Sequence, residues 1–137
     1  MIYAQKLKRE DFDLRVLVAS RKLIDDKIFR QTPEVQLQML KTWLVAASEA
    51  ENVPVPILLI CEHEAYGNGV YHRDTQSITL KKVSLVTLFH EFRHHVDCVK
   101  RGRSTEDSAR GWSVSLFFIT SPSMYKKAVE NRRLFYV

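Results

Sequence analysis

Two histidines and a glutamate lie close together in the segment HEFRH at positions 90–94. On an α-helix, residues four apart lie one above the other on the same face, so both imidazoles can reach one cation. Glu91 is one step round the helix from His90, where its carboxylate can meet a water on that cation without being a ligand itself. Two histidine ligands beside a glutamate base form the signature of a zinc metallopeptidase. The spacing therefore predicts zinc bound by His90 and His94, with Glu91 as the catalytic base.

The segment 83–100 is predicted to be the helix that carries these residues. It contains no Gly or Pro, and its apolar residues recur at roughly helical spacing. Ser84 is a plausible N-cap, and Gly102 after two basic residues is typical of a helix end. The histidines then lie in the middle of a mostly apolar helix, where a buried pair without a strong partner is unusual. The alternative is a pair of core histidines that binds no metal.

A third ligand is required, because a catalytic zinc takes three protein ligands and leaves one position for water. The chain turns at Gly102, and a second helix is predicted to begin in residues 104–107, since Ser104 and Asp107 resemble a capping box. Glu106 then lies in the first turn of that helix and is the predicted third ligand. Asp107 is the adjacent rival, but its predicted capping role directs it elsewhere.

These features resemble the gluzincin metallopeptidases, in which the His-Glu-x-x-His motif, a turn and a Glu-x-x-Ala segment (here residues 106–109) follow one another. The compactness and the strands before the motif look most like minigluzincins, minimal soluble scaffolds similar to the catalytic domains of integral-membrane metallopeptidases. The resemblance covers roughly residues 54–120. Many gluzincins carry an Asp four residues after the ligand Glu, which orients a ligand histidine. Arg110 occupies that position here, so the groups behind the ligands must be arranged differently.

The resemblance implies a fold, a cofactor and a substrate. The expected fold is α+β, with a small twisted sheet, an active-site helix, a glutamate helix and a backing helix. The expected activity is peptide-bond hydrolysis with one zinc ion, on an extended peptide that pairs with an edge strand at about residues 69–73. The oxyanion also needs a donor besides zinc. The candidates are Tyr71, His72, Arg93, His95 and Arg110, with His72 on the predicted rim strand as the first choice.

The terminal segment suggests regulation. Minigluzincins look like latent enzymes whose own terminal segments block the cleft. The end RRLFYV, residues 132–137, is apolar with a free carboxylate and could lie along the edge strand or reach a zinc, in the same or a neighbouring molecule. A latent enzyme that self-associates through this tail is therefore one expectation, and a tail folded on its own core is the other.

The remaining segments place the sheet and the other helices. Helices are expected within residues 11–30, 32–51, 105–119 and 121–133, and strands at 57–61, 70–73 and 77–80. The segment 32–51 begins with Thr-Pro-Glu, which favours a helix start, and is the predicted backing helix. The apolar run Ile57–Cys61 is expected to be a buried strand. Residues 1–31 precede the active-site region as an N-terminal extension, and residues 1–137 form one expected domain.

Composition limits the classes of function. The chain has 137 residues, 45% hydrophobic and 27% charged, as in ordinary soluble domains. No stretch approaches the ~20 apolar residues of a membrane span. Cys61 and Cys98 form no disulfide framework, which favours the cytoplasm. The net charge is +5, but the basic residues are scattered in short pairs, which argues against nucleic acid as a partner and leaves steering of an acidic substrate possible in principle. The alternative function is a non-catalytic or regulatory zinc-binding protein.

Overall fold

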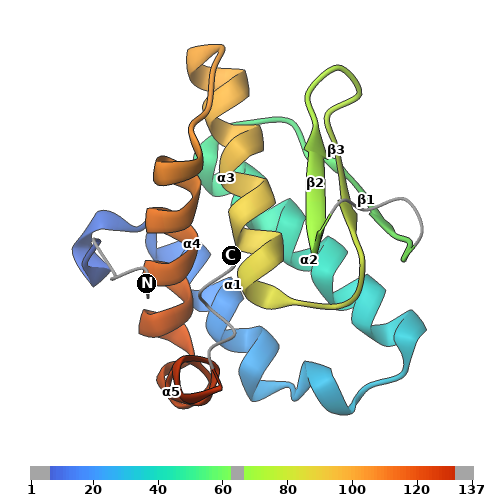
Figure 1. Ribbon diagram of the computed structural model, residues 1–137, viewed down its shortest axis with the longest axis vertical. Coiled ribbons are helices and arrows are strands. Elements are labelled where there is room, and N and C mark those ends of the chain that lie inside the picture. Colours follow the sequence, from blue (N-terminus) through green and yellow to red (C-terminus); the bar gives the residue numbers. More distant parts are fainter. Residues whose placement is uncertain (1–6, 63–66, 132–137) are drawn as a thin grey trace.

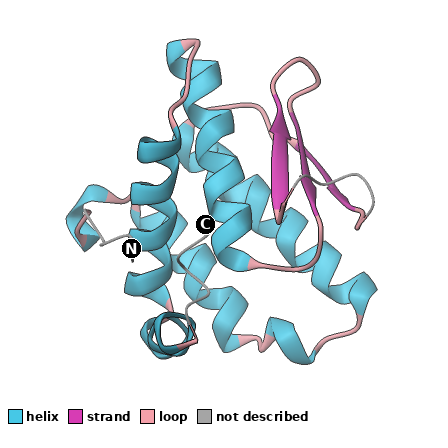
Figure 2. Cartoon of the chain, in the orientation of Figure 1, coloured by secondary structure: helices cyan, strands magenta, loops and turns pink. Residues whose placement is uncertain are grey.

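The computed structural model describes residues 7–62 and 67–131, which form an α+β fold (Figure 1). The helices are α1 (Leu14–Asp25), α2 (Pro33–Glu51), α3 (Leu85–Arg101), α4 (Glu106–Thr120) and α5 (Pro122–Glu130), with short 3-10 turns at Arg9–Asp11 and Ile28–Arg30. The strands are β1 (Ile57–Ile60), β2 (Gly69–His72) and β3 (Ser77–Leu80). Figure 2 shows the strands gathered on one side of the molecule and the helices on the other. The predicted α+β class is confirmed.

The sheet is small and mixed, in the order β1-β3-β2. β1 runs parallel to β3, and β2 runs antiparallel to it with Tyr71 opposite Ile78. Among the described strands β2 pairs only with β3, so its other edge carries backbone groups that can pair with a further extended chain. The predicted rim strand is therefore present as an edge strand.

β1 differs from its prediction as a buried strand. Ile57 is 59% exposed and Leu59 is 47% exposed, whereas Leu58 is 5% exposed. The prediction of burial is wrong because β1 lies at the outer edge of the sheet, while α3 packs against β2 and β3. An apolar run alone cannot separate a central strand from an edge strand.

α3 is held in the middle of the hydrophobic core by aromatic side chains. The ring of Trp43 on α2 lies 5.0 Å from that of Phe89 and 5.1 Å from that of Phe92. Trp112 on α4 lies 6.0 Å from Phe92 on another side of the helix. Full burial of each such side chain contributes about 1.5–3 kcal/mol. Side chains of α2 and α4 thus pack against α3, which helps to fix its position.

The two ends of α3 and the start of α4 are each defined by a capping residue. Ser84 caps α3 by accepting a hydrogen bond from the Thr87 N–H, and Gly102 ends it with a φ of 71°. The cap of α4 is Thr105, whose hydroxyl accepts from the Ser108 N–H at 3.1 Å. The predicted capping box beginning at Ser104 is therefore wrong by one residue. The Ser104 hydroxyl is used elsewhere, on a histidine of α3.

Candidate metal centre

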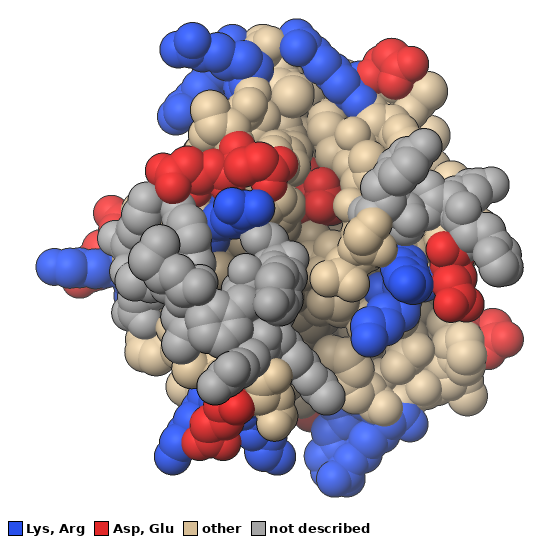
Figure 3. Space-filling model, in the orientation of Figure 1, with Lys and Arg blue, Asp and Glu red and all other residues tan. Residues whose placement is uncertain are grey.

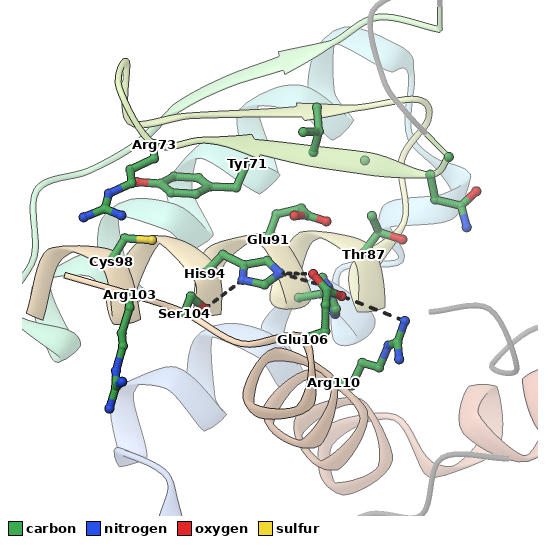
Figure 4. Close-up of a pocket in the computed structure, with 15 residues that line it drawn as sticks. Tyr71, Arg73, Thr87, Glu91, His94, Cys98, Arg103, Ser104, Glu106 and Arg110 are labelled. Atoms are coloured by element: carbon green, nitrogen blue, oxygen red, sulfur yellow. Dashed lines mark hydrogen bonds and ion pairs between the residues drawn. The ribbon is translucent and has the colours of Figure 1, made fainter. Parts of the chain in front are cut away.

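The three residues of α3 that the sequence predicts to be functional face one cavity. This cavity, of about 600 Å³, lies between the edge strand β2, the exposed face of α3 and the beginning of α4 (Figure 4). His90, Glu91 and His94 line it, and each brings one potential ligand atom within 4.8 Å of the others. The helical spacing predicted this arrangement, and the group could hold a metal ion.

Glu106 reaches both imidazoles from the following helix. Its Oε2 lies 3.1 Å from Nε2 of His90, and its Oε1 lies 2.9 Å from Nε2 of His94. The two Nε2 atoms are 3.2 Å apart. Ligand atoms at about 2.0–2.2 Å from a tetrahedral zinc are separated by roughly 3.4 Å. The donor atoms of these three residues therefore have nearly the separation that one zinc ion requires.

The other two carboxylates near this centre are placed differently. Asp107, the rival ligand from the sequence, does not line the cavity. Glu91 lines it, yet within the described chain it forms no hydrogen bond or ion pair with either imidazole. The contacts of Glu106 with both imidazoles favour Glu106 as the third ligand and leave Glu91 free for another task.

The electrostatics match these separate tasks. Glu91 is 7% exposed, and its burial, together with the negative charge of Glu106, raises its pKa to about 7. A carboxyl group with a pKa near neutrality can both accept and release a proton. Burial lowers the pKa of His90 to about 4, with a further contribution from His94. His90 is therefore neutral and has a lone pair to offer a cation.

A hydrogen-bonded chain behind His94 fixes the orientation of its ring. Nδ1 of His94 lies 2.7 Å from the Ser104 hydroxyl oxygen, and the same hydroxyl lies 3.4 Å from Oδ2 of Asp97. Since the carboxylate can only accept, the hydroxyl donates to Asp97 and accepts from the His94 Nδ1–H. This tautomer leaves the Nε2 lone pair directed at the Glu106 carboxylate and His90.

Asp97 is itself held in place by two further contacts. It is 2% exposed, accepts a hydrogen bond from the Ser108 hydroxyl at 2.9 Å and lies 3.1 Å from Nε of Arg93. It thus links α3 to the first turn of α4, which carries Glu106. Partners of this kind hold metal-binding histidines in position in many sites.

His90 has no equivalent support. Its Nδ1 is buried and has no hydrogen-bond partner among the described residues. Arg110, which occupies the position of the expected Asp, instead directs its guanidinium toward Glu106, with Nη2 at 3.9 Å from Oε2. Arg110 therefore neighbours the carboxylate of Glu106, and the histidine with a fixed tautomer is His94.

His72 is not brought to this centre. It does not line the cavity, and its Nε2 lies 3.4 Å from the Thr79 hydroxyl on the neighbouring strand. Successive residues of a strand point to opposite faces, and Tyr71 is the one that points to α3. The expectation that His72 faces the site must be corrected, because His72 lies on the face of β2 opposite to Tyr71 and does not reach the cavity.

His95 joins the sheet to α3. It is fully buried, its Nε2–H donates to the Pro54 carbonyl at 2.7 Å, and its Nδ1 accepts from the Tyr71 hydroxyl at 2.8 Å. Burial lowers the pKa of His95 and raises that of Tyr71 to about 12, so both groups stay neutral. His95 is a structural residue, and it fixes the distance of β2 from α3.

Sequence reasoning missed Ser104 and Asp97. One signal was present: Asp97 is an acidic residue between Val96 and Cys98 on the helix that carries the motif. A buried acid in such a place requires partners. Its partner Ser104 was assigned to a helix cap instead.

We compared the chain with known proteins and found no relative. No protein-family model, no curated protein and no solved structure matches this chain. Among the described helices, none has both the length and the apolar character needed to cross a membrane.

Proposed function

We propose that the protein is a zinc-dependent endopeptidase, with His90, His94 and Glu106 as ligands and Glu91 as the general base. The observation that carries the proposal is the reach of Glu106 to both imidazoles, at 3.1 and 2.9 Å. Two imidazoles and one carboxylate form a donor set typical of catalytic zinc. The minigluzincin resemblance of the motif and the following Glu-x-x-Ala segment supports the same conclusion.

The open cavity favours catalysis over a purely structural use of the metal. Structural zinc sites are closed by four protein ligands, whereas catalytic sites have three and an open position. Here three ligands face a cavity of about 600 Å³, and the Glu106 side chain is 60% exposed. The alternative, a non-catalytic or regulatory zinc-binding protein, lacks such support.

The bound zinc would supply a water of lowered pKa and a Lewis acid for the scissile carbonyl. Glu91 then accepts the proton of the attacking water and passes it to the leaving amine. The edge of β2 that no described strand covers binds the backbone of an extended peptide by main-chain pairing. His95 and Tyr71 hold that edge at a fixed height above α3.

The donor for the oxyanion is Arg110 in this proposal. Among the candidates from the sequence, only Tyr71 and Arg110 line the cavity. The Tyr71 hydroxyl is already bonded to His95. The Arg110 guanidinium lies beside the ligand Glu106 and carries several donors.

Two finer parts of the proposal concern setting and control. The two cysteines are free thiols, which fits a reducing compartment such as the cytoplasm. The inhibitory and self-associating tail, residues 132–137, lies outside the described residues. Inhibition by the tail is therefore tested by assaying a second form of the protein that lacks these residues.

Removal and return of zinc test the proposed activity. We expect the protein to bind one zinc per chain and to cleave a labelled unfolded protein. A strong chelator should stop this cleavage, and zinc, but not Mg²⁺, should restore it, because imidazoles suit zinc better than Mg²⁺. The full chain and a chain ending at residue 131 are assayed together, so that a blocking tail appears as a higher rate in the shorter form. Bound zinc without cleavage by either form would contradict the proposal.

Ser104→Ala tests the support of His94. The change removes the acceptor for the His94 Nδ1–H, and we expect zinc affinity to fall about 10- to 100-fold, as for comparable partners of ligand histidines. Ser108→Ala is the matched control, because Ser108 bonds the same Asp97 without touching His94. Competition with a chromophoric chelator measures both affinities. Equal losses in the two variants would show that the Ser104 contact with His94 has no special role.

A further inference from the structure

One end of the cavity is basic. Arg73, directly after β2, and Arg103, between α3 and α4, both line it. Figure 4 shows them on the side of Cys98, away from Arg110. On the face drawn in Figure 3, Lys and Arg side chains gather at the upper end, where α3 ends and the chain turns into α4. The two arginines come from different parts of the chain and line the cavity on the same side of the metal centre.

The two arginines flank the same end of the cavity, one on each side of Cys98 in Figure 4. A methyl group added to Gly102 would lie 3.9 Å from Nη2 of Arg73, so Arg73 extends over the residue that precedes Arg103. Because both side chains line this end of the cavity, an acidic group that enters it is attracted by two positive charges. Each guanidinium offers a planar set of donors that matches a carboxylate.

Neither arginine is neutralised by the described part of the chain. The ion pairs formed by described residues do not include Arg73 or Arg103. By contrast, Arg93 is paired with Asp97, and Arg110 lies beside Glu106. Two positive charges thus face the cavity without a carboxylate of their own.

The edge strand leads from the metal centre to this basic end. β2 lies beside α3 with the Tyr71 hydroxyl on His95, and Arg73 follows directly at the end of the strand near Gly102. Gly102 is eight residues beyond His94, or about 12 Å along the axis of α3 at 1.5 Å per residue. An extended peptide advances about 3.3 Å per residue. A peptide paired with β2 would therefore place a side chain at the arginines about four residues from the bond held at the metal centre.

We infer that Arg73 and Arg103 bind a carboxylate of the substrate and that the protein selects acidic peptides. The inference rests on the proposed peptidase function, which it extends by naming the substrate class. The carboxylate belongs either to an Asp or Glu side chain or to the free C-terminus of the peptide. The two sources present the same chemistry to the arginines, and the experiment separates them.

The test uses three peptides of one sequence with a blocked N-terminus. The first contains Glu and ends in an amide, the second contains Gln in its place and ends in an amide, and the third contains Gln and ends in a free carboxylate. Cleavage by the zinc-loaded chain of 137 residues is one readout. Binding of the same peptides to the zinc-loaded Glu91→Gln variant, by fluorescence anisotropy, is the other.

We expect the preferred acidic peptide to exceed the neutral one about tenfold in kcat/KM and in affinity. Arg73→Gln and Arg103→Gln should each reduce this ratio severalfold, and the double variant should bring it to about one. Arg101→Gln is the matched control: it removes the same charge from the last residue of α3, and it does not line the cavity. The ratio should persist in this control.

The outcomes separate the two hypotheses. Equal use of acidic and neutral peptides, or a loss in Arg101→Gln as large as in the cavity variants, overturns the carboxylate site while cleavage still supports the peptidase. If no peptide is cleaved but Glu91→Gln binds the acidic peptide in a manner that depends on Arg73 and Arg103, the carboxylate site stands and the peptidase proposal fails. The first peptide's advantage assigns the site to a side chain, and the third peptide's advantage assigns it to the C-terminus.

Discussion

Glu91→Gln is expected to reduce peptide cleavage about 10²- to 10⁴-fold while one zinc stays bound per chain. The magnitude is that of a general acid–base group removed from a reaction. Gln has nearly the shape of Glu, and the Glu91 side chain forms no hydrogen bond or ion pair within the described chain, so the fold loses no such contact. The measurement pairs cleavage of a labelled peptide with metal analysis of the same sample.

Two further variants serve as controls for the Glu91→Gln result. Glu49→Gln changes an exposed glutamate of α2 and should leave both quantities unchanged. Glu91→Asp keeps the charge but shortens the side chain, and should fall between Glu91→Gln and the unaltered protein. Loss of zinc together with cleavage in Glu91→Gln would mean that Glu91 is a ligand, as its place in the group with His90 and His94 allows.

Glu106→Gln is expected to weaken zinc binding by more than about 100-fold, beyond the usual effect of residues that only support a ligand. The change removes the carboxylate whose two oxygens face the two imidazoles, at 3.1 Å from His90 and 2.9 Å from His94. Competition with a chelator of known affinity measures the loss. Cleavage at a zinc concentration below saturation should fall in parallel.

Asp107→Asn provides the adjacent comparison. It removes one negative charge from the same helical turn without changing a residue that lines the cavity. Zinc affinity should change by no more than a few-fold. The opposite ranking, with a larger loss in Asp107→Asn, would assign the third ligand to Asp107 and would remove the main support for the proposed centre.

The helix that carries His90 and His94, and the helix that follows it, could be predicted because their signals are local. Helical spacing placed His90 and His94 on one face, and the glycine at 102 marked the end of the helix. The glutamate helix follows after a short turn, so few positions were available to Glu106. A short loop between two helices restricts their geometry, and this restriction is visible in the sequence.

The rest depended on contacts between distant residues. The exposure of β1 follows from its place at the edge of the sheet, which its apolar sequence does not reveal. The face on which His72 lies depends on strand register, where a shift of one residue reverses every side chain. The role of Ser104 depends on its hydrogen bonds with His94 and Asp97, which the sequence does not show. From the sequence alone, a role as a helix cap was equally plausible.

The most direct test is a crystal structure of the zinc-loaded protein, with anomalous data collected on both sides of the zinc absorption edge. We expect one zinc at Nε2 of His90, Nε2 of His94 and the carboxylate of Glu106, with a water in the remaining position and Glu91 beside that water. Zinc bound elsewhere, or held by Glu91 in place of Glu106, would contradict it.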